Sequence, residues 1–173
     1  MSALHPVKAF SSPRGTKTWL ATVRAYNLCD AVMSARLAEI GLRMGEHELL
    51  ANLSLVPGIT QQELAARCFV AKSGVSMLLT QMEAKALVMR QVDATDARVR
   101  RLFLTSAGEK LAAKTLKVQS DVVSAMVEGA IEVELAIVTA VMQRAAVRLE
   151  ALREGAKLVA APAASRLLGR VSR

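Results

Sequence analysis

The stretch 57–105 constrains the fold of this 173-residue chain most, because two short helical patterns are followed there by two strand patterns. Thr60 and Glu63 form a T-x-x-E capping box, which predicts that a helix begins at about Gln61. A second helix is expected over roughly 72–85, where apolar residues at helical spacing would form one buried face. The residues of that face are Val75, Leu78, Leu79 and Met82. This arrangement predicts a helix-turn-helix.

The strand patterns that follow predict a β-hairpin with a basic tip. Strands are expected over 88–92 and 99–104, joined by the loop 93–98. This order is that of a winged helix-turn-helix, in which a helix enters the DNA major groove and the hairpin reaches the adjacent backbone or minor groove. Arg98 at the tip suits a narrow, negative groove. A free carboxylate beside it would repel phosphate, so Asp96 is expected to hold the Arg98 guanidinium in a bidentate ion pair.

The outer face of the second helix carries short hydrogen-bonding side chains, which would let the helix backbone approach base edges closely. A solvated face of an ordinary helix would look the same, and the basic hairpin directly downstream favours DNA contact instead. The residues expected at the DNA are Thr60, Gln61, Lys72, Ser73, Ser76, Met77, Thr80, Arg90, Asp96, Arg98 and Arg100.

The composition agrees with a mostly α-helical fold that carries a small β-hairpin wing. Hydrophobic residues make up 53% of the chain and aromatic residues only 3%, so Ala, Val, Leu and Met must form the core. The net charge of +8 suits a nucleic-acid partner. No uncharged apolar run approaches the roughly 18 residues of a membrane span, and the N-terminus has no apolar h-region. We therefore expect a cytoplasmic protein with no membrane partner.

The flanking helices predict a homodimer. Helices are expected over about 16–40, 46–56, from a cap at Thr105 to about 127, and 131–152. The helix expected over 131–152 has apolar residues around so much of its circumference that one neighbouring helix cannot cover them all, whereas a partner subunit would cover the rest. Burial in a monomeric core is the alternative. The expected organisation is an N-terminal arm (1–13), a helical dimerisation lobe (14–56 and 106–155), a DNA-binding lobe (57–105) and a basic C-terminal tail (156–173).

From about Gly41 to Leu111 the chain resembles the multiple antibiotic resistance regulator (MarR) family of bacterial transcription factors. The matching pieces are GLRMGEHELLANLSLVPGITQQELA, SGVSMLLTQMEAKALV, the D-A-R tip and LFLTSAGEKL. The family implies a homodimeric repressor that a small molecule or oxidation releases from DNA. Ala97 replaces the first arginine of the family's usual D-R-R tip, so one DNA contact per subunit is expected to be missing. Ala86 replaces the usual glycine of the turn after the recognition helix, which must then avoid a positive φ or carry strain.

The resemblance also implies a ligand cleft between the two lobes, lined by the first, second and fifth helices. His47 falls where the family often has an aromatic residue, and the first helix offers Arg24, Asn27 and Asp30. Arg24 or His47 would fix a carboxylate or phenolate, so a small aromatic, anionic ligand is expected. The plainer interpretation of His47 is a partly buried histidine with a satisfied hydrogen bond, and no metal site is expected.

Three functional hypotheses remain. No catalytic constellation or phosphate loop occurs, so neither an enzyme nor a cofactor is predicted. The first hypothesis is a ligand-responsive repressor that binds a pseudo-palindrome in double-stranded DNA. The second is a thiol-based sensor using Cys29, which is disfavoured because Cys29 lies deep in its helix, whereas Cys68 is expected in the core. The third is a winged interaction module without DNA, which has no need of Arg98, Arg100 and Arg101.

Overall fold

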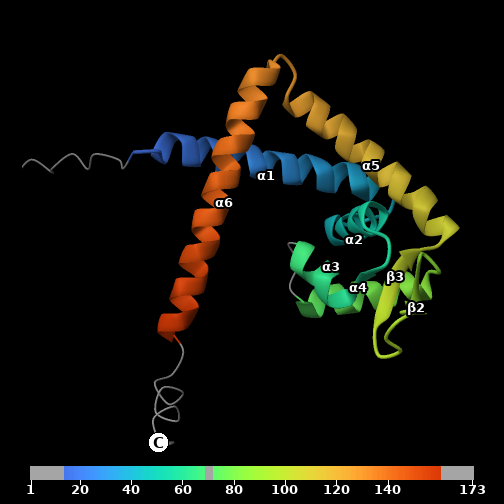
Figure 1. Ribbon diagram of the computed structural model, residues 1–173. Coiled ribbons are helices and arrows are strands. Elements are labelled where there is room, and N and C mark those ends of the chain that lie inside the picture. The colour runs from blue at the N-terminus through green and yellow to red at the C-terminus, as the bar shows by residue number, and fades with distance from the viewer. Residues whose placement is uncertain (1–13, 69–71, 161–173) are drawn as a thin grey trace, which may run out of the picture. The chain divides into compact units, whose positions relative to one another are not determined.

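The computed structural model describes residues 14–68 and 72–160 and confirms a mostly α-helical winged-helix fold (Figure 1). The chain divides into two compact units, the first ending at Met126 and the second beginning at Val127. In chain order, the elements are α1 (Thr16–Glu39), α2 (Met44–Leu55), β1 (Ile59–Thr60), α3 (Gln61–Arg67), α4 (Lys72–Ala84), β2 (Val88–Val92), β3 (Arg100–Leu104), α5 (Ser106–Met126) and α6 (Glu132–Ala160). The expected arm and most of the expected basic tail lie outside the described residues.

Most element bounds match the sequence predictions, and the differences have local causes. Helix α2 begins before Glu46 because the Glu46 carboxylate accepts a 3.0 Å hydrogen bond from the Arg43 N–H, which places Glu46 in the first turn. Strand β3 begins after Val99 because the Val99 N–H bonds to the Asp96 carbonyl inside the loop. Helix α6 continues past the predicted end at Leu152, to Ala160.

The sheet has three antiparallel strands in the order β1-β3-β2, of which β1 was not predicted. Leu102 of β3 lies opposite Ile59 of β1 and Arg90 of β2. Side chains alternate across the sheet, so these three residues share one face. Both Leu102 and Ile59 are buried there. With only two residues, β1 is too short to produce an alternating pattern in the sequence.

The core of the first unit joins the helix-turn-helix to the sheet and to α2. The predicted buried face of α4 is confirmed, because Val75, Leu79 and Met82 are fully buried and Leu78 packs against the same cluster. Helix α5 packs against α1 and α2, so the long helices support the winged part within this unit. The main fully buried side chains are Leu37, Leu49, Leu50, Leu53, Leu64, Val75, Leu79, Met82, Leu102 and Thr115.

The turn after α4 is strained at Ala86, one of the two outcomes that the sequence allowed there. Ala86 has φ 54°, and among the described residues it is the one non-glycine residue with a positive φ. The Leu87 N–H bonds to the Met82 carbonyl and the Ala86 N–H to the Glu83 carbonyl, which is the Schellman pattern that favours glycine. The Thr105 hydroxyl donates to the Ala86 carbonyl and accepts from the Gly108 N–H. The predicted cap at Thr105 therefore also fixes this turn.

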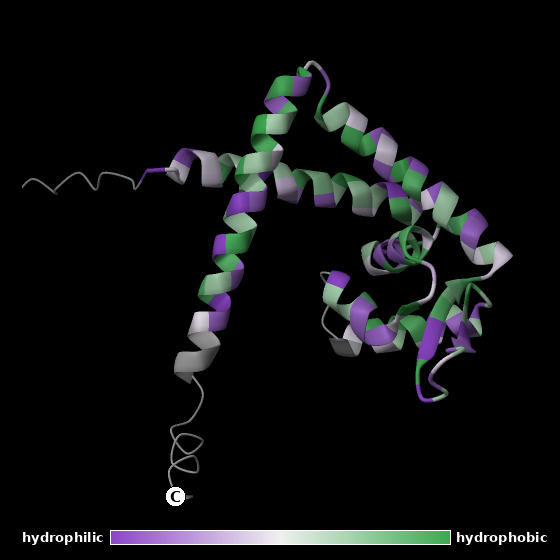
Figure 2. Ribbon diagram, viewed as in Figure 1, coloured by the Kyte–Doolittle hydropathy of each residue, from purple (hydrophilic) through white to green (hydrophobic). Residues whose placement is uncertain are grey.

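The long helices expose many large apolar side chains in the single chain. On α6 these residues alternate with hydrophilic ones along the helix (Figure 2). Across 14–68 and 72–160, no helix is long and apolar enough to cross a membrane. The exposed apolar residues of α1, α5 and α6 are Trp19, Leu20, Val23, Tyr26, Leu28, Val32, Leu116, Val123, Met126, Val133, Ile137, Val138, Val141, Val147, Leu149 and Leu152.

Replacing Ala86 with glycine should stabilise the protein. Glycine adopts φ 54° without the steric cost that a Cβ brings, and we expect the free energy of unfolding to rise by about 0.5–1 kcal/mol. Ala84→Gly is the matched control, because Ala84 is exposed in the last turn of α4 and glycine should lower stability there by a similar amount. Urea unfolding measures both changes, and a destabilised Ala86→Gly variant would contradict the assignment of strain to this turn.

Candidate nucleic-acid interface

The outward face of α4 presents a short polar surface. Ser76, Met77 and Thr80 are all exposed, as expected of side chains that meet DNA. The Thr80 hydroxyl donates to the Ser76 carbonyl over 3.1 Å, and its oxygen can still accept a further bond. Lys72 and Ser73 begin the helix, but their side chains lie outside the described part of the chain. The exposure of Ser76, Met77 and Thr80 agrees with the sequence prediction that this face of the helix points outward.

The far end of α4 is held by an ion pair that the sequence did not predict. The Lys85 ammonium lies 2.9 Å from the carboxylate of Glu46, whose side chain is 7% exposed. Burial opposes ionisation of Glu46, but the bonds from Lys85 and from the Arg43 N–H outweigh it and lower its pKa. The pair ties the end of the second helix of the helix-turn-helix to the start of α2.

Arg90, expected at the DNA, is engaged within the protein. Its Nε donates to Glu83 Oε1 of α4 over 2.6 Å, and its Nη1 donates to Gln61 Oε1 of α3 over 3.3 Å. Arg90 therefore joins the sheet to both helices of the helix-turn-helix, and Glu83 neutralises its charge. The arrangement favours a positioning role for Arg90 and Gln61 over a direct phosphate contact.

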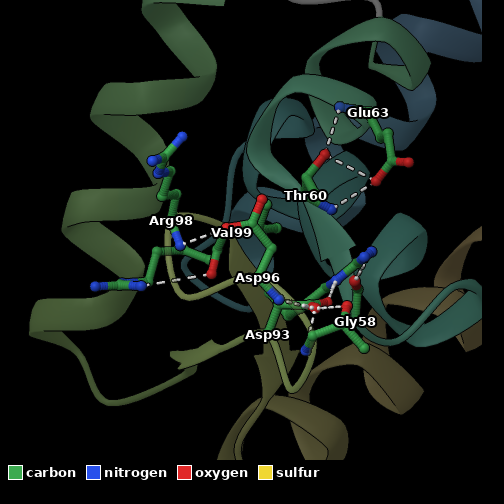
Figure 3. Close-up of polar contacts among 10 residues, drawn as sticks. Gly58, Thr60, Glu63, Asp93, Asp96, Arg98 and Val99 are labelled. Atoms are coloured by element: carbon green, nitrogen blue, oxygen red, sulfur yellow. Dashed lines mark hydrogen bonds and ion pairs between the residues drawn. The ribbon is translucent and has the colours of Figure 1, made fainter.

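The predicted capping box at the start of α3 is confirmed. The Thr60 hydroxyl accepts from the Glu63 N–H over 3.2 Å, and the Glu63 carboxylate accepts from the Thr60 N–H over 2.8 Å (Figure 3). The two hydrogen bonds from Thr60, the backbone one first, lower the pKa of Glu63. Thr60 is thus occupied in fixing the helix start, which sits next to the wing through the pairing of β1 with β3.

The predicted ion pair between Asp96 and the Arg98 guanidinium is wrong. Asp96 Oδ1 accepts a 2.9 Å bond from the backbone N–H of Arg98, so it holds the loop backbone and not the guanidinium (Figure 3). Short Asp side chains commonly bond the backbone two residues ahead in turns, and this local bond competes with a side-chain pair. Arg100 donates from Nη1 to the Ala97 carbonyl over 2.7 Å.

The wing loop is organised by Asp93, which the sequence analysis did not single out. Its Oδ1 accepts from the Thr95 N–H (2.8 Å), the Thr95 hydroxyl (2.6 Å) and the Asp96 N–H (3.1 Å). Its Oδ2 accepts from Arg101 Nε over 2.6 Å. The bonds from Thr95, then the Arg101 guanidinium, hold the pKa of Asp93 far below its usual range. The D-x-T spacing of an Asx turn was the available signal for the local half of this arrangement.

The arginines of the hairpin therefore fall into two groups. Arg90 and Arg101 are paired with carboxylates, whereas Arg98 and Arg100 are exposed and form no ion pair within the described residues. An exposed guanidinium with no carboxylate partner keeps its full charge for a phosphate. The unpaired charges lie at the wing tip, where the sequence predicted DNA contact.

A cavity of about 260 Å³ lies among α1, α2, α3 and α5, in agreement with the cleft that the family resemblance implied. His47, one of the two predicted anchors, and Asp30 line it, but the other predicted anchor, Arg24, and the expected Asn27 do not. His47 is 5% exposed, and burial lowers its pKa although it has a hydrogen bond to the Gln119 side chain. Its Nδ1 has no hydrogen-bond partner within the described residues.

The cavity also contains Arg67, which the sequence analysis missed as a ligand candidate. Arg67 ends α3, and its Nε donates to Asn52 Oδ1 of α2 over 3.0 Å. The half-buried Cys29 lines the same cavity. Cys68 is buried as predicted, and burial raises the pKa of its thiol to about 11. The described residues hold no cluster of three or more His, Cys, Asp or Glu side chains that fits a metal ion.

Comparison with known proteins agrees with this geometry. A family model described as the MarR family matches residues 40–99. The chain is 36% identical to the transcriptional regulator HosA of Escherichia coli over 77 residues, which cover 44% of this chain and 57% of HosA.

Two solved structures show the same fold. AbsC, a MarR family transcriptional regulator of Streptomyces coelicolor, aligns with a TM-score of 0.72 and 22% identity over 83% of this chain and 99% of AbsC. Bordetella bronchiseptica BpsR, whose DNA binding is regulated by 6-hydroxynicotinic acid, aligns with a TM-score of 0.67 and 14% identity over 79% of this chain and 97% of BpsR.

The helix-turn-helix, the wing and these likenesses define a DNA-binding, winged-helix transcriptional regulator. The match of residues 40–99 to the MarR family model agrees with the resemblance seen in the sequence.

Proposed function

We propose that the protein is a homodimeric repressor whose recognition helix α4 reads a pseudo-palindromic operator and whose wing holds the DNA backbone. The observation that supports this most is that one compact unit combines an exposed polar face on α4 with two wing arginines that form no ion pair within the described residues. Ser76, Met77 and Thr80 would meet base edges in the major groove. Arg98 and Arg100 would meet phosphates or the minor groove.

A homodimer would cover the apolar surface that the single chain exposes. Val138 and Leu149 of α6 are 57% and 64% exposed, and α1 and α5 expose further large apolar residues. Fully burying one such side chain contributes about 1.5–3 kcal/mol, so their exposure favours a second subunit over solvent. Two-fold symmetry would then place two copies of α4 on successive major grooves, about 10 base pairs apart.

A small aromatic, anionic ligand would release the repressor from DNA by occupying the cavity among α1, α2, α3 and α5. Arg67 takes the role of carboxylate anchor that the sequence assigned to Arg24, and the buried His47 offers a second polar group. Arg67 belongs to the helix-turn-helix, so a ligand that binds it acts on the DNA-binding part. BpsR offers a precedent, because 6-hydroxynicotinic acid is an aromatic acid that regulates its DNA binding. The ligand shifts the equilibrium by its different affinity for the DNA-bound and released spacings.

Operator binding should separate base contacts from backbone contacts. Thr80→Ala should weaken binding by about 1–3 kcal/mol on the operator and little on unrelated DNA. Arg98→Ala should weaken binding to every sequence, and the slope of log K against log salt should become shallower by about two for the dimer. Ser54→Ala, exposed on α2, is the control. Fluorescence anisotropy with DNA from upstream of the protein's own gene measures this, and an unchanged slope in Arg98→Ala removes the wing from the proposal.

Sedimentation at micromolar concentration should show a species of twice the 18.5 kDa chain mass. Val138→Glu should shift it towards the monomer, because a carboxylate would be buried in the apolar interface. Gln143→Glu places the same charge on a position of α6 that is already polar and should leave the dimer intact. A wild-type protein that sediments only as the monomer contradicts the homodimer.

We expect at least one aromatic carboxylate or phenol to raise the melting temperature of the protein and to dissociate its complex with the operator. The first compound to test is 6-hydroxynicotinic acid. Arg67→Met should keep operator binding and lose this response, because the carboxylate anchor is gone. The control is peroxide on wild type and Cys29→Ser. If every acid leaves the complex intact while peroxide dissolves it through Cys29, the protein is a thiol sensor instead.

A further inference from the structure

We propose that Asp93 is the positioning residue of the wing: it fixes the loop so that Arg98 and Arg100 face the DNA backbone. The inference rests on the proposed mode of DNA binding and assigns a role to a residue that makes no DNA contact itself. Asp93 lies at the loop entrance, directly after β2.

Asp93 joins both halves of the loop through its two carboxylate oxygens. Oδ1 accepts from the N–H groups of Thr95 and Asp96 and from the Thr95 hydroxyl, which folds the first half. Oδ2 accepts from Arg101 Nε on the returning strand at 2.6 Å. The Asp93 N–H also bonds to the Val99 carbonyl over 3.1 Å. One side chain, 13% exposed, thus sets the path of the backbone that carries Arg98 and Arg100.

Arg101 connects this loop to the rest of the winged lobe. While its Nε binds Asp93, its Nη1 donates to the Gly58 carbonyl over 3.2 Å, just before β1 and the start of α3. Its guanidinium therefore spans from the wing to the helix-turn-helix through two donor nitrogens held in one rigid plane. Asp93 acts through Arg101 to fix the wing relative to α3.

The wing tip carries few unpaired positive charges, so the position of each one matters for DNA binding. Ala97 supplies no charge, so Arg98 and Arg100 are the unpaired cations that the described loop and β3 offer. Asp96 contributes a single bond to the Arg98 backbone N–H, which an asparagine oxygen can also accept. Asp93 therefore positions the wing, whereas Asp96 stabilises only a local turn.

The change in operator affinity when Asp93 is neutralised distinguishes a positioning role from a purely electrostatic one. Removing a carboxylate near DNA reduces repulsion of phosphate, so a purely electrostatic role predicts tighter binding when Asp93 is neutralised. A positioning role predicts weaker binding, because the charges of Arg98 and Arg100 remain but their geometry is lost. The two explanations therefore move the affinity in opposite directions.

The test compares Asp93→Asn with Asp96→Asn in the full chain, by titrating operator DNA at several salt concentrations. Both variants remove one negative charge from the same loop, but only Asp93→Asn replaces the oxygen that accepts from Arg101 with a donor. Asp93→Asn should bind the operator at least about tenfold more weakly than wild type. Its slope of log K against log salt should be shallower by up to about three to four for a dimer, as expected when four phosphate contacts are lost. Asp96→Asn should bind as tightly as wild type or more tightly.

A second variant keeps the proposal testable if Asp93→Asn folds poorly. Arg101→Lys retains the charge but replaces the two separate donor atoms that bind Asp93 and Gly58 with a single nitrogen, so it should also weaken binding and make the slope shallower. Circular dichroism and urea unfolding establish that each variant is folded at the assay temperature. A wild-type chain that binds no operator overturns the proposed function itself. The positioning role alone is overturned if wild type binds the operator and both folded variants, Asp93→Asn and Arg101→Lys, bind it as tightly as wild type and with the same salt slope.

Discussion

The alternation of side chains along β3 is the constraint on which the winged part of this protein depends. Leu102 and Leu104 point into the core, where each is at least nine-tenths buried, and Arg101 points to the opposite face. Burying Leu102 stabilises the fold by about 2 kcal/mol and fixes the strand register, because a one-residue slip would place arginine in the core. The same register brings Arg101 to Asp93 and Gly58. Core packing thus determines where the wing charges lie.

The arrangement divides the arginines of the hairpin by function. Arg90 and Arg101 are neutralised by Glu83 and Asp93, and they join the sheet to the helix-turn-helix and to the loop. Arg98 and Arg100 keep their charge at the surface. A cation that is already paired gives little to a phosphate, because the pair must first be broken. Net charge alone therefore overstates how many cations a wing of this kind offers to DNA.

The sequence predicted what is encoded locally. The Thr60–Glu63 capping box, the buried face of α4 and the bounds of β2 arise from residues a few positions apart, where spacing carries the signal. Pairs between distant residues were missed, as in the ion pair of Glu46 with Lys85, which are 39 positions apart. The Asp96 prediction failed because a local bond to the backbone was as accessible as the expected side-chain pair. In the cavity, only the fold could show that Arg67, and not Arg24, is the arginine that lines it together with His47.

In the proposed mode of binding, contacts inside the winged lobe place the wing on the DNA backbone while α4 reads the bases. Hydroxyl-radical footprinting of one operator with wild type and Asp93→Asn tests this most directly, because it maps backbone contacts position by position. Wild type is expected to protect two central patches one helical turn apart and the flanking backbone beside each patch. Asp93→Asn is expected to lose the flanking protection and to keep the central patches. Identical footprints for the two proteins would contradict it.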